Sequence, residues 1–147
     1  MKKLIAAAIM LTTAHTAHAG PYTDDLSKCL VESSTAQDKL DLVKWMFAAM
    51  ALHPAVEDLA SVEQSDRDTQ NEVMANLIFR LIAEDCVETT RKVVKYEGPE
   101  AIQASFQILG QVAAGELFTN PKVAEGLSEL DKYIDADKFN DILGGNE

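Results

Sequence analysis

The spacing of the apolar residues is the feature that most constrains the fold of this chain. Apolar side chains recur at intervals of three and four residues, as in the series Met74, Ile78, Ile82 and Cys86, which is the spacing of one face of an α-helix. No segment alternates apolar and polar residues between hairpin turns, and the β-branched residues are scattered. The sequence therefore predicts an all-α protein, a single-domain bundle of five to seven helices with one disulfide.

Capping residues divide the chain into helical segments. Thr35 with Asp38, and Thr69 with Glu72, have the spacing of capping boxes, whereas Gly98 is typical of a helix end. The polar residues that precede Thr69 predict a connecting loop over 55–68. We expect helices over residues 26–31, 35–52, 69–94, 99–113, 121–134 and 135–143.

The distribution of apolar residues also predicts which helix faces are buried. The segment 40–52 is apolar on nearly every face from Val43 onward, which indicates a buried central helix. Gly110 and Ala114 lie four residues apart, a spacing that lets another helix approach closely. We expect one core that contains Trp45, Phe47, Ile78, Leu81 and Phe106, and an inward face formed by Val123, Leu127, Leu130 and Ile134.

The first 19 residues have the pattern of a secretory signal peptide. Lys2 and Lys3 precede an apolar run, and Ala17-His18-Ala19 is a typical cleavage site before Gly20. An uncleaved anchor is the alternative, but the run is far shorter than the roughly 20 residues that cross a bilayer. We predict a signal peptide at 1–19, a helical domain at 20–147 with a frayed tail at 144–147, and a periplasmic or secreted location without membrane insertion after cleavage.

Cys29 and Cys86 are the two cysteines of the chain, and export places them in a compartment where thiols oxidise. Both lie on apolar helical faces, so we predict a disulfide that joins the first helix to a central one. A redox-active pair is the alternative interpretation, but such pairs typically have C-x-x-C spacing.

Residues suited to catalysis or metal binding are few. Signal cleavage removes His15 and His18 and leaves His53, so a catalytic triad or an imidazole metal site lacks partners. We interpret His53, at a helix end before Pro54, as structural. The acidic pairs at positions 66 and 68, and at 135 and 137, lack the glycine and glutamate of a calcium loop. We predict no catalytic residues, no metal, no cofactor and no enzymatic activity.

The chain is strongly acidic, and the acids are concentrated in two stretches. Removal of Lys2 and Lys3 leaves 11 basic side chains against 24 acidic ones, a net charge of -13. Such a charge repels nucleic acids and anionic lipids. Residues 53–72 carry a net charge of -5 and residues 120–147 a net charge of -4. Acids predicted to attract a basic protein partner are Glu57, Asp58, Glu63, Asp66 and Asp68, although solubility alone also explains an acidic surface.

These patterns leave three hypotheses for function. The first is a non-enzymatic binding protein that docks a protein partner through its acidic surface, for example an immunity protein against a periplasm-acting toxin. The second is an acid-stress periplasmic holdase chaperone, whose charge balance collapses when carboxylates protonate. The third is a carrier that holds a small apolar ligand between helices lined by Met46, Phe47, Met50 and Phe106. The sequence leaves the oligomeric state open.

Overall fold

The computed structural model describes residues 20–144, and every regular element in this range is helical. The all-α prediction is confirmed, as is the single disulfide. The predicted signal peptide, residues 1–19, and the last three residues of the predicted tail lie outside the described residues. No helix between residues 20 and 144 has the length and apolar character that a membrane span requires.

Seven α-helices and three shorter helical turns follow one another along the described chain. The α-helices are α1 (Pro21–Ser33), α2 (Ala36–Met50), α3 (Gln64–Arg80), α4 (Val87–Tyr96), α5 (Glu100–Phe118), α6 (Pro121–Ser128) and α7 (Ala136–Leu143). The shorter turns are η1 (Glu57–Leu59), η2 (Leu81–Asp85) and η3 (Glu129–Tyr133).

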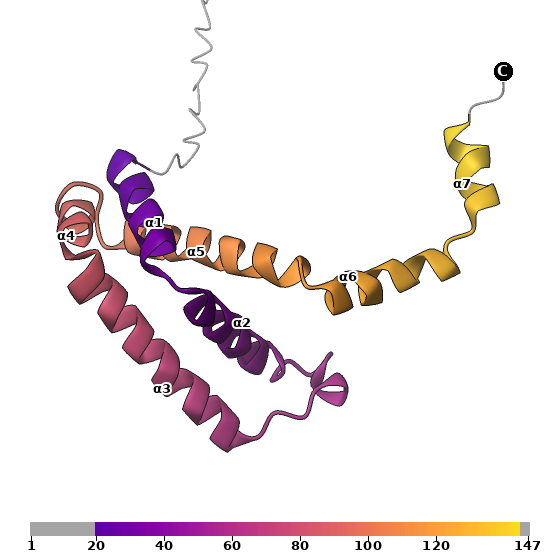
Figure 1. Cartoon of the computed structure of the whole chain (residues 1–147), viewed down its shortest axis with the longest axis horizontal. Coiled ribbons are helices and arrows are strands. Elements are labelled where there is room, and N and C mark those ends of the chain that lie inside the picture. The colour runs from indigo at the N-terminus through magenta and orange to yellow at the C-terminus, as the bar shows by residue number, and fades with distance from the viewer. Residues whose placement is uncertain (1–19, 145–147) are drawn as a thin grey trace, which may run out of the picture.

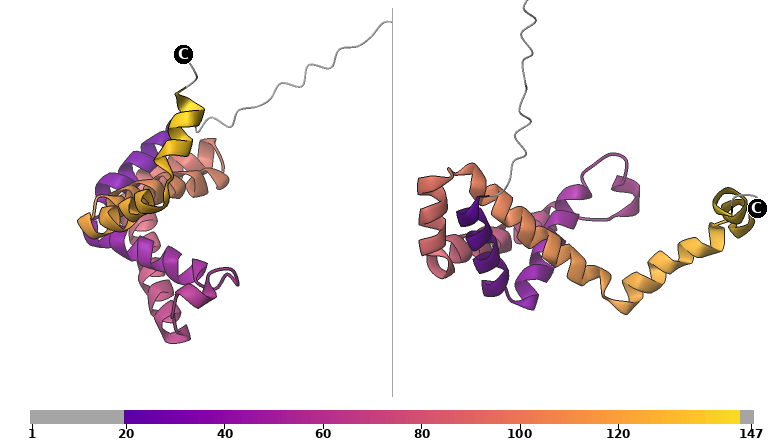
Figure 2. Two further views of the ribbon diagram at one scale, coloured as in Figure 1. Left: turned by 90° about the vertical axis from the view of Figure 1, so that its right-hand side faces the viewer. Right: turned by 90° about the horizontal axis from the view of Figure 1, so that it is seen from above.

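Helix α5 is the element around which the others are arranged (Figure 1). Both α1 and α2 pack against α5, α3 packs along α2, and α4 contacts α1 and α5. From the end of α5, the helices α6 and α7 extend away from the rest of the molecule, as Figure 1 and the right-hand view of Figure 2 show. The helices α1 to α5 therefore form a packed body, and the residues after them form a projecting arm.

The hydrophobic core lies where α1 to α5 meet. It is built mainly from leucines, whose side chains are long enough to reach between helices that pack 8–10 Å apart. Its buried members are Leu26, Leu30, Leu42, Met74, Leu77, Leu81, Cys86, Val93, Leu109 and Ala113. Trp45 and Phe106, predicted for this core, are partly buried against it.

Local signals place most helix ends correctly. Thr35 accepts a hydrogen bond from the Asp38 amide and Asp38 accepts one from the Thr35 amide, which completes the predicted capping box. Gly98 has a φ of 92°, a backbone conformation that favours glycine and ends the helical run. Asn120 and Asp135 cap α6 and α7 through their side chains.

The predicted long helix over residues 69–94 is wrong in two respects. Helix α3 begins at Gln64, five residues before Thr69, because Glu63 and Asp66 form a capping box. Both residues lie within the predicted loop over 55–68. The helix also breaks at η2, a π-helical turn in which the Cys86 amide bonds to the Leu81 carbonyl. The buried series is therefore Met74, Leu77, Leu81, Cys86, Thr90 and Val93, with one interval of five residues, and Ile78 lies outside it.

The interpretation of 40–52 as a buried helix is also wrong. In α2 only Leu42 and Ala48 are buried, whereas the Phe47 side chain is 54% exposed. Among the described elements, helix α2 packs against α3 and α5, so two of its sides are covered and the third faces outward. A helix that is apolar on every side is buried only when other helices surround it. Helix α2 has two such neighbours in the described chain, so its third side stays exposed.

The predicted inward face of the C-terminal segment is wrong for the same reason. Leu127, Leu130 and Ile134 are exposed in the described chain, and Val123 is half-buried. Helix α6 contacts α5 and η3, and α7 contacts no other described element. The amphipathic pattern predicted helical structure here correctly, although α6 ends at Ser128 and the 3-10 turn η3 follows it. Within the described chain, no second layer covers these elements.

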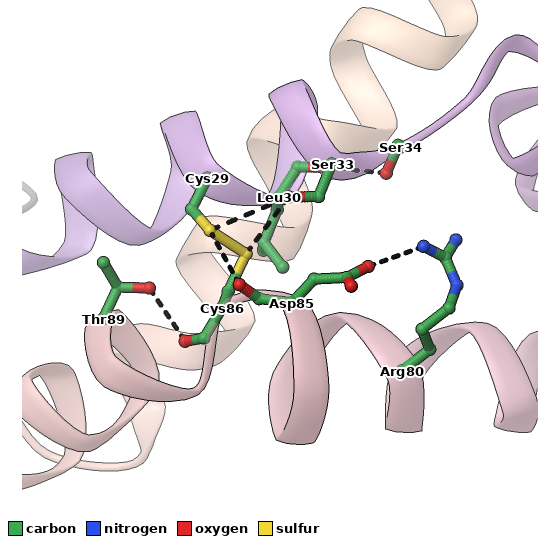
Figure 3. The surroundings of a disulfide bond; sticks show 8 residues. All are labelled: Cys29, Leu30, Ser33, Ser34, Arg80, Asp85, Cys86 and Thr89. Atoms are coloured by element: carbon green, nitrogen blue, oxygen red, sulfur yellow. Dashed lines mark hydrogen bonds and ion pairs between the residues drawn. A yellow bond between two sulfur atoms is a disulfide. The ribbon is translucent and has the colours of Figure 1, made fainter.

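The Cys29–Cys86 disulfide links α1 to the end of η2 (Figure 3). Beside it, Arg80 at the end of α3 forms ion pairs with Asp85 at 2.6 Å and with Asp38 at 2.7 Å. One guanidinium therefore joins α2, α3 and η2. The bond closes a loop of 57 residues, which restricts the unfolded chain and contributes about 4 kcal/mol in the chain-entropy model.

Candidate functional site

The described residues assemble no cluster of metal-ligating side chains. Between residues 20 and 144, no group of three or more His, Cys, Asp or Glu side chains is placed to hold a metal ion. His53 is exposed, and its Nδ1 accepts a hydrogen bond from the Ala55 amide at 3.1 Å. The ring therefore stabilises the turn after α2.

The acidic residues singled out in the sequence divide into two groups. Glu57 and Asp58 lie exposed in η1. Glu63 and Asp66 instead cap α3, and Asp68 accepts a hydrogen bond from Gln64 at 2.7 Å. The structure places all five in the connection after α2 and the first turns of α3. Three of them, Glu63, Asp66 and Asp68, already accept hydrogen bonds that stabilise the start of α3.

None of these five acids forms an ion pair within the described chain. Arg67 is the one basic residue of this segment, and it donates to the Val62 carbonyl at 2.6 Å and to Gln64 at 2.8 Å. Because its donors are directed to these two oxygens, the guanidinium forms no direct contact with the acids. Glu57 and Asp58 present their charge to solvent.

Large exposed apolar side chains lie close in sequence to these two acids. At the end of α2 and in the following connection, five of them are exposed, with the Leu59 side chain at 84%. We name this surface the loop patch; its members are Phe47, Met50, Leu52, Val56 and Leu59. Exposed apolar side chains with a charged rim are typical of protein interaction surfaces, and sequence reasoning missed this patch because it assigned Phe47 to the core.

A second feature is a groove between α2, α3 and α5, with a volume of about 650 Å³. We name it the α5 groove. Its apolar lining consists of Leu42, Trp45, Met46, Met74, Ile78 and Phe106. The Trp45 indole donates to Asn71 of α3 at 2.9 Å, which fixes the ring in the wall. Of the four residues predicted to line a carrier cavity, Met46 and Phe106 line this groove, whereas Phe47 and Met50 belong to the loop patch.

The α5 side of the groove carries glutamines and small residues. Gln103, Gln107 and Gln111 recur every four residues, with Gly110 and Ala114 beside them. A methyl group added at Gly110 would meet no other part of the described chain within 4 Å. The close helix approach predicted for Gly110 and Ala114 therefore does not occur within the described chain, and the space stays open. The spacing of these two residues, together with Met46 and Phe106 of the predicted carrier lining, was the sequence signal for the groove.

The start of α1 has a different electrostatic arrangement. Its N-cap, Gly20, has no side chain to accept hydrogen bonds. The Glu97 carboxylate, from the end of α4, accepts the amides of Tyr22 at 2.9 Å and Thr23 at 2.8 Å and the Thr23 hydroxyl. Burial raises the pKa of Glu97, but these hydrogen bonds outweigh it and hold the pKa below its ordinary value of 4.5. This carboxylate acts as a remote helix cap.

The described residues therefore present two candidate surfaces for binding, the loop patch and the α5 groove. No family model, curated protein or solved structure matches this chain.

Proposed function

We propose that this protein is an exported, non-enzymatic binding protein that docks a basic protein partner at the loop patch. The observation that carries the proposal is the combination of exposed Phe47, Met50 and Leu59 with the unpaired carboxylates of Glu57 and Asp58. An apolar centre supplies affinity, while the acidic rim steers a basic partner and raises its association rate. Neutralisation of a periplasm-acting toxin is the concrete form of this function.

Export rests on the sequence pattern of residues 1–19 and agrees with the disulfide, since structural disulfides occur mainly in oxidising compartments. The intact mass of the purified protein tests this step. We expect the mass of residues 20–147 less two hydrogens. A mass that includes Met1 to Ala19 would refute cleavage.

Docking is tested by replacing Glu57 and Asp58, the two acidic residues of this surface that do not cap α3. Proteins from a periplasmic extract are passed over the immobilised mature chain, and the association rate of the retained partner is then measured at increasing salt. The double variant Glu57→Gln/Asp58→Asn should slow association several-fold and flatten its salt dependence. Glu63 and Asp66 are left unchanged because they cap α3.

The matched control is Glu84→Gln/Glu125→Gln, which removes the same charge from two exposed acids without ion pairs in the described chain. Equal association rates for the two double variants would show that the rim does not steer docking. Leu59→Asp should abolish retention if the apolar centre supplies affinity.

Repeating the capture at pH 3 separates the proposal from the holdase hypothesis. A docking protein retains one partner at pH 7 and loses it as its carboxylates protonate. A holdase instead retains many unfolded clients in acid and none at pH 7. The second pattern would replace docking with the chaperone function.

A further inference from the structure

The Glu97 carboxylate occupies the place of a side chain that Gly20 lacks. Gly20 is the N-cap of α1, a position whose side chain ordinarily accepts hydrogen bonds from the amides two and three residues further on. Glu97 accepts these two amides instead, from Tyr22 at 2.9 Å and Thr23 at 2.8 Å. Its Oε2 lies 2.8 Å from the position that a Cβ of residue 20 would take, and its Oε1 is nearer still.

This placement also brings the backbone nitrogen of Gly20 close to the carboxylate. The nitrogen and Cβ positions of one residue are about 2.5 Å apart, so the Gly20 nitrogen lies within about 5 Å of both Glu97 oxygens. In the uncleaved chain this nitrogen belongs to a neutral amide. Hydrolysis of the bond between residues 19 and 20 leaves a carboxylate on Ala19 and an amino group on Gly20, which takes up a proton at pH 7.

The surroundings of Gly20 carry negative charge without a matching cation. Gly20 lines a hollow of about 660 Å³ between α1 and α5, which we name the Gly20 hollow. Asp24, Glu97 and Glu100 line it as well, and no Lys, Arg or His of the described chain does. None of these three acids forms an ion pair within residues 20–144. The hollow therefore has the charge that receives a cation.

We propose that the ammonium group released by cleavage before Gly20 forms an ion pair with Glu97 in the Gly20 hollow, so that processing completes the cap of α1. The Gly20 carbonyl accepts the Asp24 amide at 3.0 Å, which fixes this residue at the start of the helix. An amino terminus one residue earlier would lie about 3.8 Å further along the chain. The fold thereby distinguishes a chain that begins at Gly20 from its uncleaved precursor.

The inference rests on the export step of the proposed function, so its test uses a chain whose amino terminus is set by synthesis. A peptide thioester of residues 20–28 is ligated to an expressed chain that begins at Cys29, and the bond to Cys86 is then oxidised. Two versions of the mature chain differ only at the Gly20 nitrogen. One has the free amine, and the other is acetylated, which reproduces the neutral amide of the precursor.

Urea unfolding of the two chains at pH 7 measures the ion pair. An ammonium group without a partner opposes the dipole at a helix N-terminus, so acetylation ordinarily stabilises a helix. The proposal predicts the opposite order. The unfolding equilibrium constant should be about 2- to 5-fold smaller for the free amine, the range of a partly exposed ion pair.

Raising the pH to 10 provides a second measurement that needs no substitution. The amine then loses its proton, and the stabilisation by its protonated form is lost as the pH rises through its pKa. The two chains should therefore become equally stable. The titratable groups around this end of α1 are the same in both chains: Tyr22, Asp24, Lys95, Tyr96, Glu97 and Glu100.

Two substitutions identify the partner of the amine. Glu97→Gln keeps an oxygen that can accept the amides of α1 but removes the charge, so the free-amine chain should no longer be the more stable one. Asp25→Asn is the matched control. Asp25 is an exposed acid of α1 that lies outside the hollow and has no ion pair in the described chain, so its replacement should preserve the difference.

Three results would overturn the proposal. An acetylated chain at least as stable as the free-amine chain at pH 7 would mean that the ammonium group has no partner. A difference that persists at pH 10 would not depend on charge, and one that survives Glu97→Gln would have another origin. Failure of the export step is seen separately, in the intact mass of the exported protein, because the ligated chains begin at Gly20 by synthesis.

Discussion

Glu97 shows how one side chain holds the N-terminal end of the fold in place. Its carboxylate accepts hydrogen bonds from Tyr22 and Thr23, and it lies so close to Gly20 that a side chain there would overlap it. The stack of Tyr22 on Tyr96, with ring centroids 4.9 Å apart, lies beside it. A residue other than glycine at position 20 would displace the carboxylate and leave the first turn of α1 without its cap.

At the residue scale, two carboxylates predict how stability depends on pH. Burial raises the pKa of Asp38, but hydrogen bonds from Thr35 and the contact with Arg80 outweigh it and hold the pKa below its ordinary value of 3.8. The pKa of Glu97 is also lowered. A carboxyl group whose pKa is lower in the folded than in the unfolded state stabilises the fold. This contribution is complete at pH values above the unfolded-state pKa, and it is lost as the pH falls through the folded-state pKa.

Urea unfolding between pH 7 and pH 3 should therefore show stability that falls below about pH 4.5. Glu97→Gln and Asp38→Asn should each be less stable than the wild type at pH 7 and lose less on acidification. Glu84→Gln, at an exposed acid without an ion pair in the described chain, should keep the wild-type profile. Parallel profiles for all four proteins would contradict the assigned roles.

At the scale of elements, two leucines that each lie in a short helical turn differ in how far they are buried. Leu81 is fully buried at the start of η2, whereas Leu59 in η1 is 84% exposed. Leu81→Ala should reduce the free energy of unfolding by about 2–5 kcal/mol, and Leu59→Ala should change it by less than about 0.5 kcal/mol. Urea denaturation of both variants measures this, and similar losses would mean that the helix faces are misassigned.

The same scale shows what the sequence can predict. Helix ends at Thr35, Gly98 and Asn120 follow from hydrogen bonds within a few residues, so local sequence determines them. Whether Phe47 or Leu127 is covered depends on how many helices reach that side, which no local pattern contains. The α5 groove needs three helices in their final arrangement. The sequence indicated it only in part, through the spacing of Gly110 and Ala114 and the predicted ligand-lining residues Met46 and Phe106.

At the scale of the molecule, the disulfide joins α1 to the middle of the chain, while α2 and α3 lie within the loop that it closes. The double variant Cys29→Ala/Cys86→Ala should retain its helical circular dichroism but lose about 4 kcal/mol of unfolding free energy. Chemical denaturation with and without reductant measures the loss. Equal midpoints for variant and wild type would show that the bond does not stabilise the mature protein.

The π-helical turn η2 limits which insertions and deletions the gene can tolerate. A π-turn holds one residue more than an α-turn, so it is equivalent to a single-residue insertion in a continuous helix. Deletion of one residue between Leu81 and Cys86 would leave an α-helical interval of four residues, so Cys86 would still face Cys29 and Val93 would stay in the core. Deletion of one residue from the continuous helix α3 would instead rotate everything after it by about 100° and carry both residues away from these positions. Loss of a single residue should therefore be tolerated in η2, where it removes the π-turn, but not in the uninterrupted turns of α3 that precede it.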